Sequence, residues 1–321
     1  MFDFEKLNDV KIGIVGDFAL DIYWHADMKK SELSRETPHF PLPVDRERIY
    51  PGAAGNVAAC IAALKPAKLA LCGVIGDDWR GMLIEREFEK ISADTTGIIK
   101  EEGRFTNTYC KPMRRNGDVE YEDPRIDFAA QTPPSAETEA AVLAWIDKME
   151  RELDVICVCE QFACSIITDA IRERLCRCRT TVIADSRSNG HRYHNVILKP
   201  NEQECRGALI ALGAEPTTDD AENGEMLSRL TGCRVMLTLG ERGSLWVAGK
   251  LHHIAPFRYD GPVDFCGAGD AFLSAFASFT AAGVSPDKAG RYASAASSVT
   301  IRKLGVTGTA SREEIREVMG Q

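Results

Sequence analysis

The chain has 321 residues, of which 44% are hydrophobic and 27% charged, a composition typical of a soluble globular protein with a well-buried core. Its net charge of −9 argues against a nucleic-acid partner, because phosphate backbones are bound by clustered Lys and Arg. No apolar stretch approaches the roughly 20 residues that span a bilayer, and the first ten residues do not resemble a secretory signal. We therefore expect a cytoplasmic protein with no membrane partner.

Short β-rich runs alternate with longer runs of helical period along the chain. The predicted strands cover 10–16, 67–76, 155–159, 180–185, 195–199 and 234–240, and the predicted helices include 53–64, 80–91, 136–153 and 167–177. This alternation is typical of a parallel sheet covered by helices on both faces. We expect a single α/β domain over residues 1–321 with a doubly wound, mostly parallel sheet.

Two segments interrupt this alternation. Residues 18–50 are polar and aromatic and contain three prolines, and residues 104–127 consist of extended pieces around the turn at 116–118. Neither segment resembles a crossover helix, so both are predicted to form a small β lid over a cleft. An exposed sheet edge has unpaired backbone groups and an exposed sheet face can be apolar, so we expect a homodimer in which the lids cover each other.

The N-terminal half holds polar residues at two predicted turns. The first strand leads into VGDFALDIYWHA, where Asp17 and Asp21 lie at the edge at which open α/β sheets bind ligands, although a lone aspartate there is more often a turn residue. The run at 50–60 places Gly52 in a tight turn and Asn56 at the start of a helix of small residues. Helix packing explains the small residues and leaves Asn56 only a capping role.

Two further turns follow predicted strands in the C-terminal half. LKPNEQE places Asn201 and Glu204 at a strand end, where a helix cap followed by a surface glutamate is the simplest interpretation. RVMLTLGERGSLWV contains Thr238, Gly240 and Gly243, and flanking strands favour a β-hairpin turn. Each of these patterns is weak by itself.

The strongest local signal is PVDFCGAGDAFLSAFASFTAAG at 262–283. Gly267, Ala268 and Gly269 have almost no side chain and lead into an apolar helix, so unpaired backbone amides at the helix start would attract an anion. Asp270 is then either a helix cap or a base beside an anion hole. The turn alone favours the cap.

Taken in order, these motifs resemble those of the ribokinase, or PfkB, family of carbohydrate kinases. The family signature runs from an Asp through small residues to Gly-Asp, and here Asp264 and Asp270 enclose the Gly267–Gly269 turn. The segment 16–44 is most similar to the heptose-7-phosphate kinase subgroup, with matches at Ser34, Glu36 and Pro38. The resemblance implies a ribokinase-like fold and ATP-dependent phosphorylation of a hydroxyl on a sugar or sugar phosphate, with Mg2+ as cofactor. It leaves open a monovalent cation such as K+.

The resemblance also implies a role for each matching residue. Asp270 is the expected general base, and the Gly267, Ala268 and Gly269 turn is the expected anion hole. The expected nucleotide-binding residues are Asn201, Glu204, Thr238, Gly240, Gly243 and Asp264, with Glu204 holding magnesium through water. The expected acceptor-binding residues are Asp17, Asp21, Gly52, Asn56 and Arg125.

Several positions depart from the family pattern. Phe265, Ala53 and Ser294 replace residues that the pattern favours, and they motivate an alternative: a catalytically weak or inactive ligand-binding relative. The subgroup arginine beside the substrate is absent. If the substrate carries a phosphate, the basic candidates to bind it are Arg35, Lys111, Arg114 and Arg115, which otherwise are solvated lid charges. A dinucleotide-dependent oxidoreductase is disfavoured because no predicted strand is followed by Gly-x-Gly-x-x-Gly.

Overall fold

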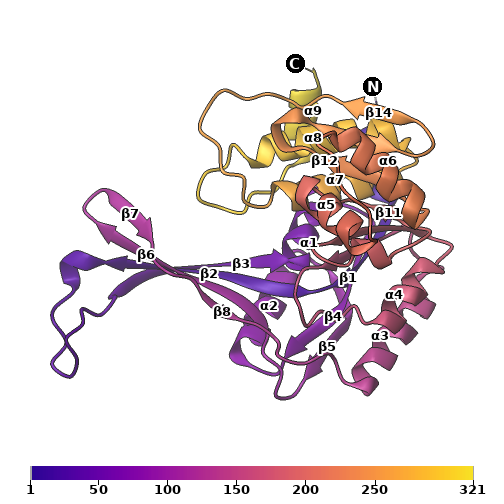
Figure 1. Cartoon of the computed structure of the whole chain (residues 1–321). Helices are drawn as coiled ribbons and strands as arrows, with labels where there is room; N and C mark the ends of the chain where they lie inside the picture. The colour runs from indigo at the N-terminus through magenta and orange to yellow at the C-terminus, as the bar shows by residue number, and fades with distance from the viewer. Residues whose placement is uncertain (1, 321) are drawn as a thin grey trace.

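The computed structural model describes residues 2–320, so the two end residues of the predicted domain lie outside the described part. Nine strands form the main sheet in the order β14-β13-β12-β11-β10-β9-β1-β4-β5 (Figure 1). From β5 to β12 every neighbouring pair is parallel, and β13 pairs antiparallel with both β12 and β14. The strand bounds are β1 (Lys11–Gly16), β4 (Lys68–Gly76), β5 (Asp94–Glu101), β9 (Val155–Glu160), β10 (Thr181–Ser186), β11 (Ile197–Leu198), β12 (Arg234–Thr238), β13 (Ser244–Val247) and β14 (Leu251–Ile254).

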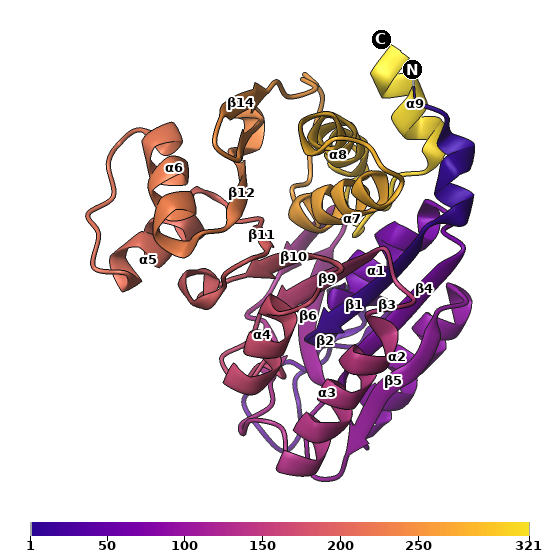
Figure 2. The ribbon, with the colours of Figure 1, turned by 90° about the vertical axis from the view of Figure 1, so that its right-hand side faces the viewer.

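Helices cover both faces of this sheet (Figure 2). One core layer lies beneath α1 (Ala54–Ala63), α2 (Trp79–Lys90), α7 (Ala268–Ala281), α8 (Pro286–Thr300) and α9 (Arg312–Gly320). The other lies beneath α3 (Ala136–Met149), α4 (Asp169–Cys176), α5 (Glu202–Ala211) and α6 (Asp220–Thr231). Short 3-10 helices cover Phe4–Asp9, Met28–Lys30, Gly190–Arg192 and Gly240–Arg242. Among residues 2–320, no helix has both the length and the apolar character needed to cross a membrane.

The alternation of side chains along a strand assigns them to the two layers. In β9, Cys157 belongs to the layer of α7, whereas Ile156 and Val158 belong to the layer of α3 and α4. All six β9 residues are buried, as expected of a strand covered on both faces.

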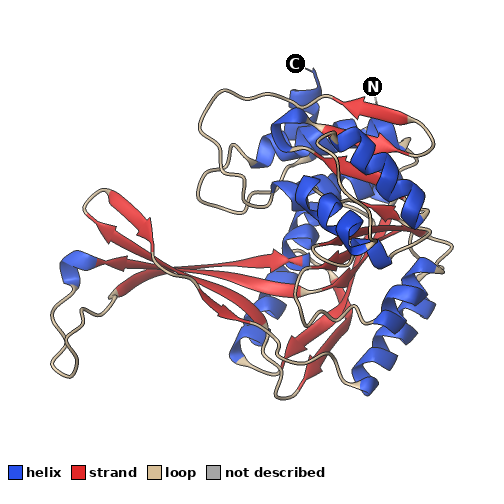
Figure 3. Cartoon of the chain, viewed as in Figure 1, coloured by secondary structure: helices blue, strands red, loops and turns tan. Residues whose placement is uncertain are grey.

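A second sheet extends away from the main body as a long ribbon (Figures 1 and 3). Its strand order is β3-β2-β6-β7, with β8 also paired to β6. The strands are β2 (Phe18–Asp27), β3 (Val44–Ala53), β6 (Asn107–Asn116), β7 (Val119–Glu122) and β8 (Ile126–Phe128). The inner part of β2 is buried, but the outer part of β3 is exposed. The predicted fold class, a doubly wound and mostly parallel sheet with a small β lid, is confirmed.

Candidate active site

The candidate site lies at the edge of the sheet where the parallel strands end. Asp17 directly follows β1, Glu160 ends β9, and Asp185 is the penultimate residue of β10. Asn201 follows β11 and forms a bridge with Thr238 at the end of β12. Because the carboxyl ends of parallel strands meet at one edge, residues from five separate segments border the same region.

Asp270 is the third residue of α7 and does not cap it. The N-cap is Gly267, whose φ of 76° is in the left-handed region that suits glycine, and no side chain caps the helix. The Asp270 carboxylate instead accepts a 2.6 Å hydrogen bond at Oδ2 from Asn56 Nδ2. Interpreting Asp270 as a helix cap is therefore wrong, and the side chain is available to a ligand.

The surroundings of Asp270 make it an unusually basic carboxylate. Burial raises its pKa to about 6, the hydrogen bond from Asn56 opposes that rise, and the nearby charge of Asp185 adds to it. A Cβ at position 267 would lie 2.8 Å from Asn56 Nδ2, so only glycine lets the turn approach this amide so closely. The turn and Asn56 therefore fit together around one carboxylate.

Positive charge gathers at the start of α7. The first amides of the helix lack acceptors within it, as at any α-helix N-terminus. Lys199 Nζ would lie 3.9 Å from a Cβ at position 269, and it forms a buried ion pair of 3.0 Å with Asp185 Oδ2. Asp264 fixes the preceding turn by accepting from the amides of Cys266 and Gly305, at 3.0 Å each. This arrangement can hold an anion.

Asn201 and Glu204 form a complete capping box at the start of α5. Asn201 Oδ1 accepts from the Glu204 amide, and Glu204 Oε2 accepts from the Asn201 amide, both at 2.9 Å. Burial raises the pKa of Glu204, and the charge of Asp185 adds to that rise. Within residues 2–320, no three His, Cys, Asp or Glu side chains gather closely enough to hold a metal ion directly. This donor set fits a magnesium ion held through water, not one ligated by several carboxylates.

The Thr238–Gly243 motif joins β12 to β13 as a hairpin turn. Gly240 and Gly243 have φ values of 56° and 88°, and a Cβ at position 243 would lie 2.1 Å from the Ile254 carbonyl oxygen. Hairpin geometry accounts for both glycines without a ligand. The bridge between Thr238 and Asn201 nevertheless places this turn beside the capping box.

The side of the site nearest the lid is organised around Asp21. Its Oδ1 lies 2.8 Å from Lys111 Nζ, which also donates to the Tyr23 hydroxyl at 2.9 Å. Burial lowers the pKa of Lys111, but the charge and hydrogen bond of Asp21, together with the contact to Tyr23, outweigh that effect and raise the pKa above its usual value. A Cβ at Gly52 would lie 2.6 Å from Asp21 Oδ2, so this glycine makes room for the carboxylate.

The side chains of Asp17 and Arg125 both form contacts within the protein. The buried Asp17 carboxylate accepts from the amides of Gln161, Phe162 and Ile166 and from the Ser165 hydroxyl. It therefore holds the loop at 161–166, and its contact with sugar hydroxyls stays a prediction. Arg125 is exposed, pairs with Asp127 through two bonds of 2.6 and 2.7 Å, and lies over the Tyr109 ring.

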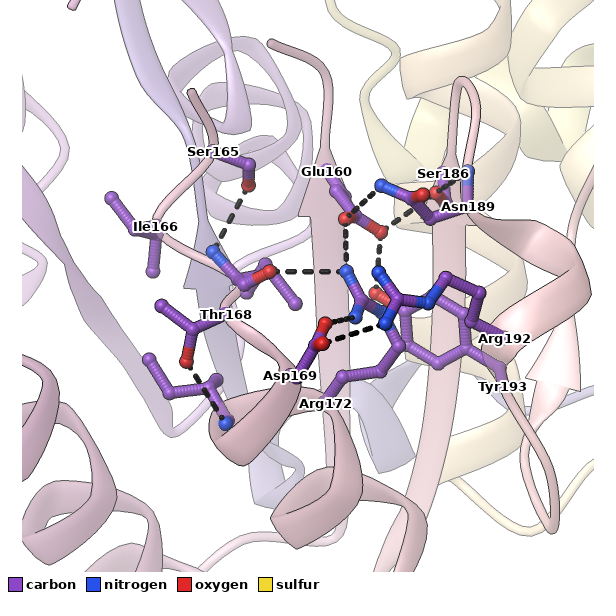
Figure 4. Close-up of polar contacts among 12 residues, drawn as sticks. Glu160, Ser165, Ile166, Thr168, Asp169, Arg172, Ser186, Asn189, Arg192 and Tyr193 are labelled. Atoms are coloured by element: carbon purple, nitrogen blue, oxygen red, sulfur yellow. Dashed lines mark hydrogen bonds and ion pairs between the residues drawn. The ribbon is translucent and has the colours of Figure 1, made fainter. Parts of the chain in front are cut away.

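A buried polar cluster adjoins the site (Figure 4). The Glu160 carboxylate is 2% exposed and accepts four hydrogen bonds, from Arg172, Ser186, Asn189 and Tyr193, at 2.6 to 2.8 Å. Arg172 also donates to the Ile167 carbonyl. This Glu160 cluster fixes the loops at 161–168 and 186–193, which border the site.

Sequence reasoning missed Asp185 and Lys199. Both lie at the carboxyl ends of predicted strands, at 180–185 and 195–199, which is the signal that singled out Asp17. That signal was therefore sufficient to find them. The pairing of the two, by contrast, depends on the neighbouring positions of β10 and β11 in the sheet.

Comparisons with known proteins agree with this architecture. The model of the pfkB family carbohydrate kinases matches residues 22–313. "Bifunctional protein HldE" of Citrifermentans bemidjiense is 29% identical over 98% of this chain, which spans 64% of that relative. Thermotoga maritima ribokinase is 23% identical with a TM-score of 0.73, covering 97% of this chain and 100% of that one. Arabidopsis thaliana ribokinase, solved with ribose and ATP, is 20% identical with a TM-score of 0.72, covering 98% and 99%.

The two ribokinases confirm the predicted ribokinase-like fold, since likeness at these identities concerns the fold alone. The family match extends over most of the chain, from the middle of β2 into α9. It includes the turn before Asp270, the capping box and the hairpin turn. The chain belongs to the pfkB family of carbohydrate kinases, as its motifs predicted.

Proposed function

We propose that the chain transfers a phosphoryl group from ATP to a hydroxyl of a sugar or sugar phosphate, with Asp270 as the general base. The observation that carries this proposal is the Asp270 carboxylate at the first turn of α7, held by Asn56 and bordered by the Lys199 ammonium. Family membership and the ribokinase solved with ribose and ATP support it.

Asp270 accepts the proton of the attacking hydroxyl. With a pKa of about 6, the carboxylate is ionised at pH 7 yet is a stronger base than an ordinary aspartate. The Asn56 amide fixes its orientation through the 2.6 Å bond to Oδ2, and the second oxygen, Oδ1, is the proposed proton acceptor. Positioning of this kind accounts for much of the catalysis of phosphoryl transfer.

The amides at the start of α7 and the Lys199 ammonium stabilise negative charge on the transferred oxygens. Removing one donor of such a site typically costs about 3 to 4 kcal/mol of transition-state stabilisation. Magnesium, when bound with the nucleotide, supplies further neutralisation of phosphate charge. Glu204 would hold that ion through water, because its Oε2 already accepts from the Asn201 amide.

Replacing K+ by tetramethylammonium in the assay measures any dependence of turnover on a monovalent cation.

Asp21 is the proposed acceptor of hydrogen bonds from the sugar hydroxyls. The ion pair with Lys111 fixes its position at the base of the lid. Arg125, lying over Tyr109, borders the same side. Lys111, Arg114 and Arg115 are all paired with carboxylates, so none of them is a free cation for a substrate phosphate.

The deciding experiment is an ATP-consumption assay over a panel of sugars and sugar phosphates, with Asp270→Asn as the paired variant. We expect turnover with at least one acceptor and a loss of about 100-fold or more in the variant, with nucleotide binding retained. An inactive relative would consume ATP with none of them. Near wild-type turnover in Asp270→Asn would show that another group is the base.

A further inference from the structure

Arg187 lies at the boundary between the two halves of the site. It directly follows β10, which stands in the sheet between β9 on the side of Asp17 and β11 on the side of Asn201. The acceptor residues belong to the first side and the nucleotide motifs to the second. A residue at the end of β10 is therefore placed where the transferred group passes from one half to the other.

Backbone geometry places this side chain on the same side of the chain as Asp185. The Arg187 amide donates to the Glu160 carbonyl at 3.0 Å, which continues the pairing of β10 with β9 by one residue. Side chains alternate along an extended strand, so Arg187 is on the side of Asp185, the partner of Lys199. Ser186, between them, is directed to Glu160.

Two neighbours indicate where the guanidinium lies. Burial raises the pKa of the Tyr109 hydroxyl in the lid and of the Glu204 carboxyl at α5, and the Arg187 charge opposes the rise at both. Tyr109 pairs with Asp21 in the register of β6 and β2, so it marks the acceptor side. The Arg187 charge thus acts on one residue of the acceptor side and on one residue of the nucleotide side.

This guanidinium is exposed and has no carboxylate partner among residues 2–320, whereas Lys111, Lys199 and Arg125 each have one. An unpaired cation between two substrate sites is suited to an anionic ligand.

The Glu160 cluster gives the Arg187 segment a fixed backbone (Figure 4). Ser186 on one side, and Asn189 and Tyr193 on the other, all donate to the same buried carboxylate. Because both ends of this short segment are already held, little backbone entropy is lost when the Arg187 side chain binds a ligand.

We propose that Arg187 is a further catalytic residue that contacts the phosphoryl group during its transfer. This proposal rests on the proposed function. The acceptor oxygen forms a bond to phosphorus, the bond from phosphorus to the leaving oxygen of ADP breaks, and the hydroxyl proton goes to Asp270. Arg187 donates N–H bonds to the non-bridging oxygens throughout and exchanges no proton.

The first test measures binding and needs no known acceptor. Thermal unfolding is followed with MgADP alone and with MgADP plus aluminium fluoride, which mimics the transferred phosphoryl group. We expect aluminium fluoride to raise the unfolding temperature of the wild type and of Arg192→Gln, a control in the same loop whose guanidinium pairs with Asp169. Arg187→Gln should lose that increment and keep the response to MgADP. No increment in the wild type, or an equal one in Arg187→Gln, overturns the assignment.

The second test is kinetic, with an acceptor from the panel above. We expect Arg187→Gln to lower kcat by about 100- to 1,000-fold, with the KM for ATP within about threefold, and Arg187→Lys to recover part of the loss. An effect confined to the KM of phosphorylated acceptors would instead make Arg187 a substrate-binding residue and overturn the proposal. A wild type that turns over no acceptor refutes the proposed function, and the aluminium fluoride test then decides on Arg187 independently.

Discussion

Asn56 Nδ2 and Asp270 Oδ2 lie 2.6 Å apart although 214 residues separate them in the chain. The contact joins the first turn of α1 to the first turn of α7, and the two helices also meet where the Ser274 hydroxyl donates to the Val57 carbonyl at 3.0 Å. The orientation of the proposed base is thus set by a residue of the acceptor half. A change at the acceptor-binding residue Asn56 should therefore also change the orientation of the Asp270 carboxylate.

The first prediction is that kcat/KM falls as the pH drops through about 6, because Asp270 must be ionised to accept a proton and its pKa in the free protein is about 6. The hydrogen bond from Asn56 lowers that pKa, so Asn56→Ala should raise it and move the acidic limb upward by about one pH unit. A pH series of kcat/KM for the wild type, Asn56→Ala and the exposed control Asn8→Ala measures this. An Asn56→Ala limb that coincides with that of the wild type would contradict it.

The second prediction concerns stability. The pKa of Asp270 is raised from 3.8 in the unfolded chain to about 6 in the folded one, so the native state binds the extra proton and its stability declines as the pH rises from about 4 to about 6. Above pH 6 the decline is complete and amounts to about 1 to 3 kcal/mol. Asp270→Asn, permanently neutral, should therefore unfold at a higher urea concentration than the wild type at pH 8 and at a similar one at pH 4.

Urea unfolding at the two pH values, with Asp287→Asn as a control, separates this effect from a general change of charge. Asp287 has a lowered pKa, so the same substitution there should not stabilise the protein at pH 8. An Asp270→Asn variant less stable than the wild type at pH 8 would show that the folded protein tolerates the buried charge without penalty.

The layers of the fold were predictable because strand runs such as VICVC and helix runs such as that of α3 carry their periods in the sequence. β5 was not predicted, because its sequence DTTGIIKE is polar along one face and only half-buried. In the site, the motif residues were predictable from their turns. The Arg187 segment was not, because its place depends on Glu160 and on the position of β10 between β9 and β11, which no local pattern records.

The third prediction starts from the backbone of Ala53. This residue has φ 50° and ψ −126°, a conformation that costs an L-residue about 1 to 3 kcal/mol. Ala53→Gly should therefore stabilise the chain by about 1 kcal/mol, even though glycine is more flexible in the unfolded state. The matched control, Ala59→Gly in the middle of α1, should destabilise it by about 1 kcal/mol. Urea midpoints measure both, and a destabilised Ala53→Gly variant would show that no strain is stored there.

The fourth prediction is that the chain forms a homodimer through the lid sheet. The outer lid exposes four large apolar side chains to about half of their possible extent: Val44, Val119, Tyr121 and Ile126 at 49%, 50%, 54% and 48%. An apolar surface on a sheet projecting from the body is suited to a second copy of the same sheet. We expect light scattering to give twice the chain mass for the wild type.

Charge placed in that surface should separate the two copies. We expect the double variant Tyr121→Lys/Ile126→Lys to have the mass of one chain. Ile210→Lys serves as the control, because Ile210 is 64% exposed on α5 in the main body, and it should leave the dimer intact. A wild type with the mass of one chain at micromolar concentration, or dissociation caused equally by Ile210→Lys, would exclude the lid as the interface. In the dimer, the main body of the chain and the second copy would both support the lid strands that carry Asp21, Lys111 and Tyr109. Dissociation should therefore raise the KM of the acceptor more than the KM of ATP.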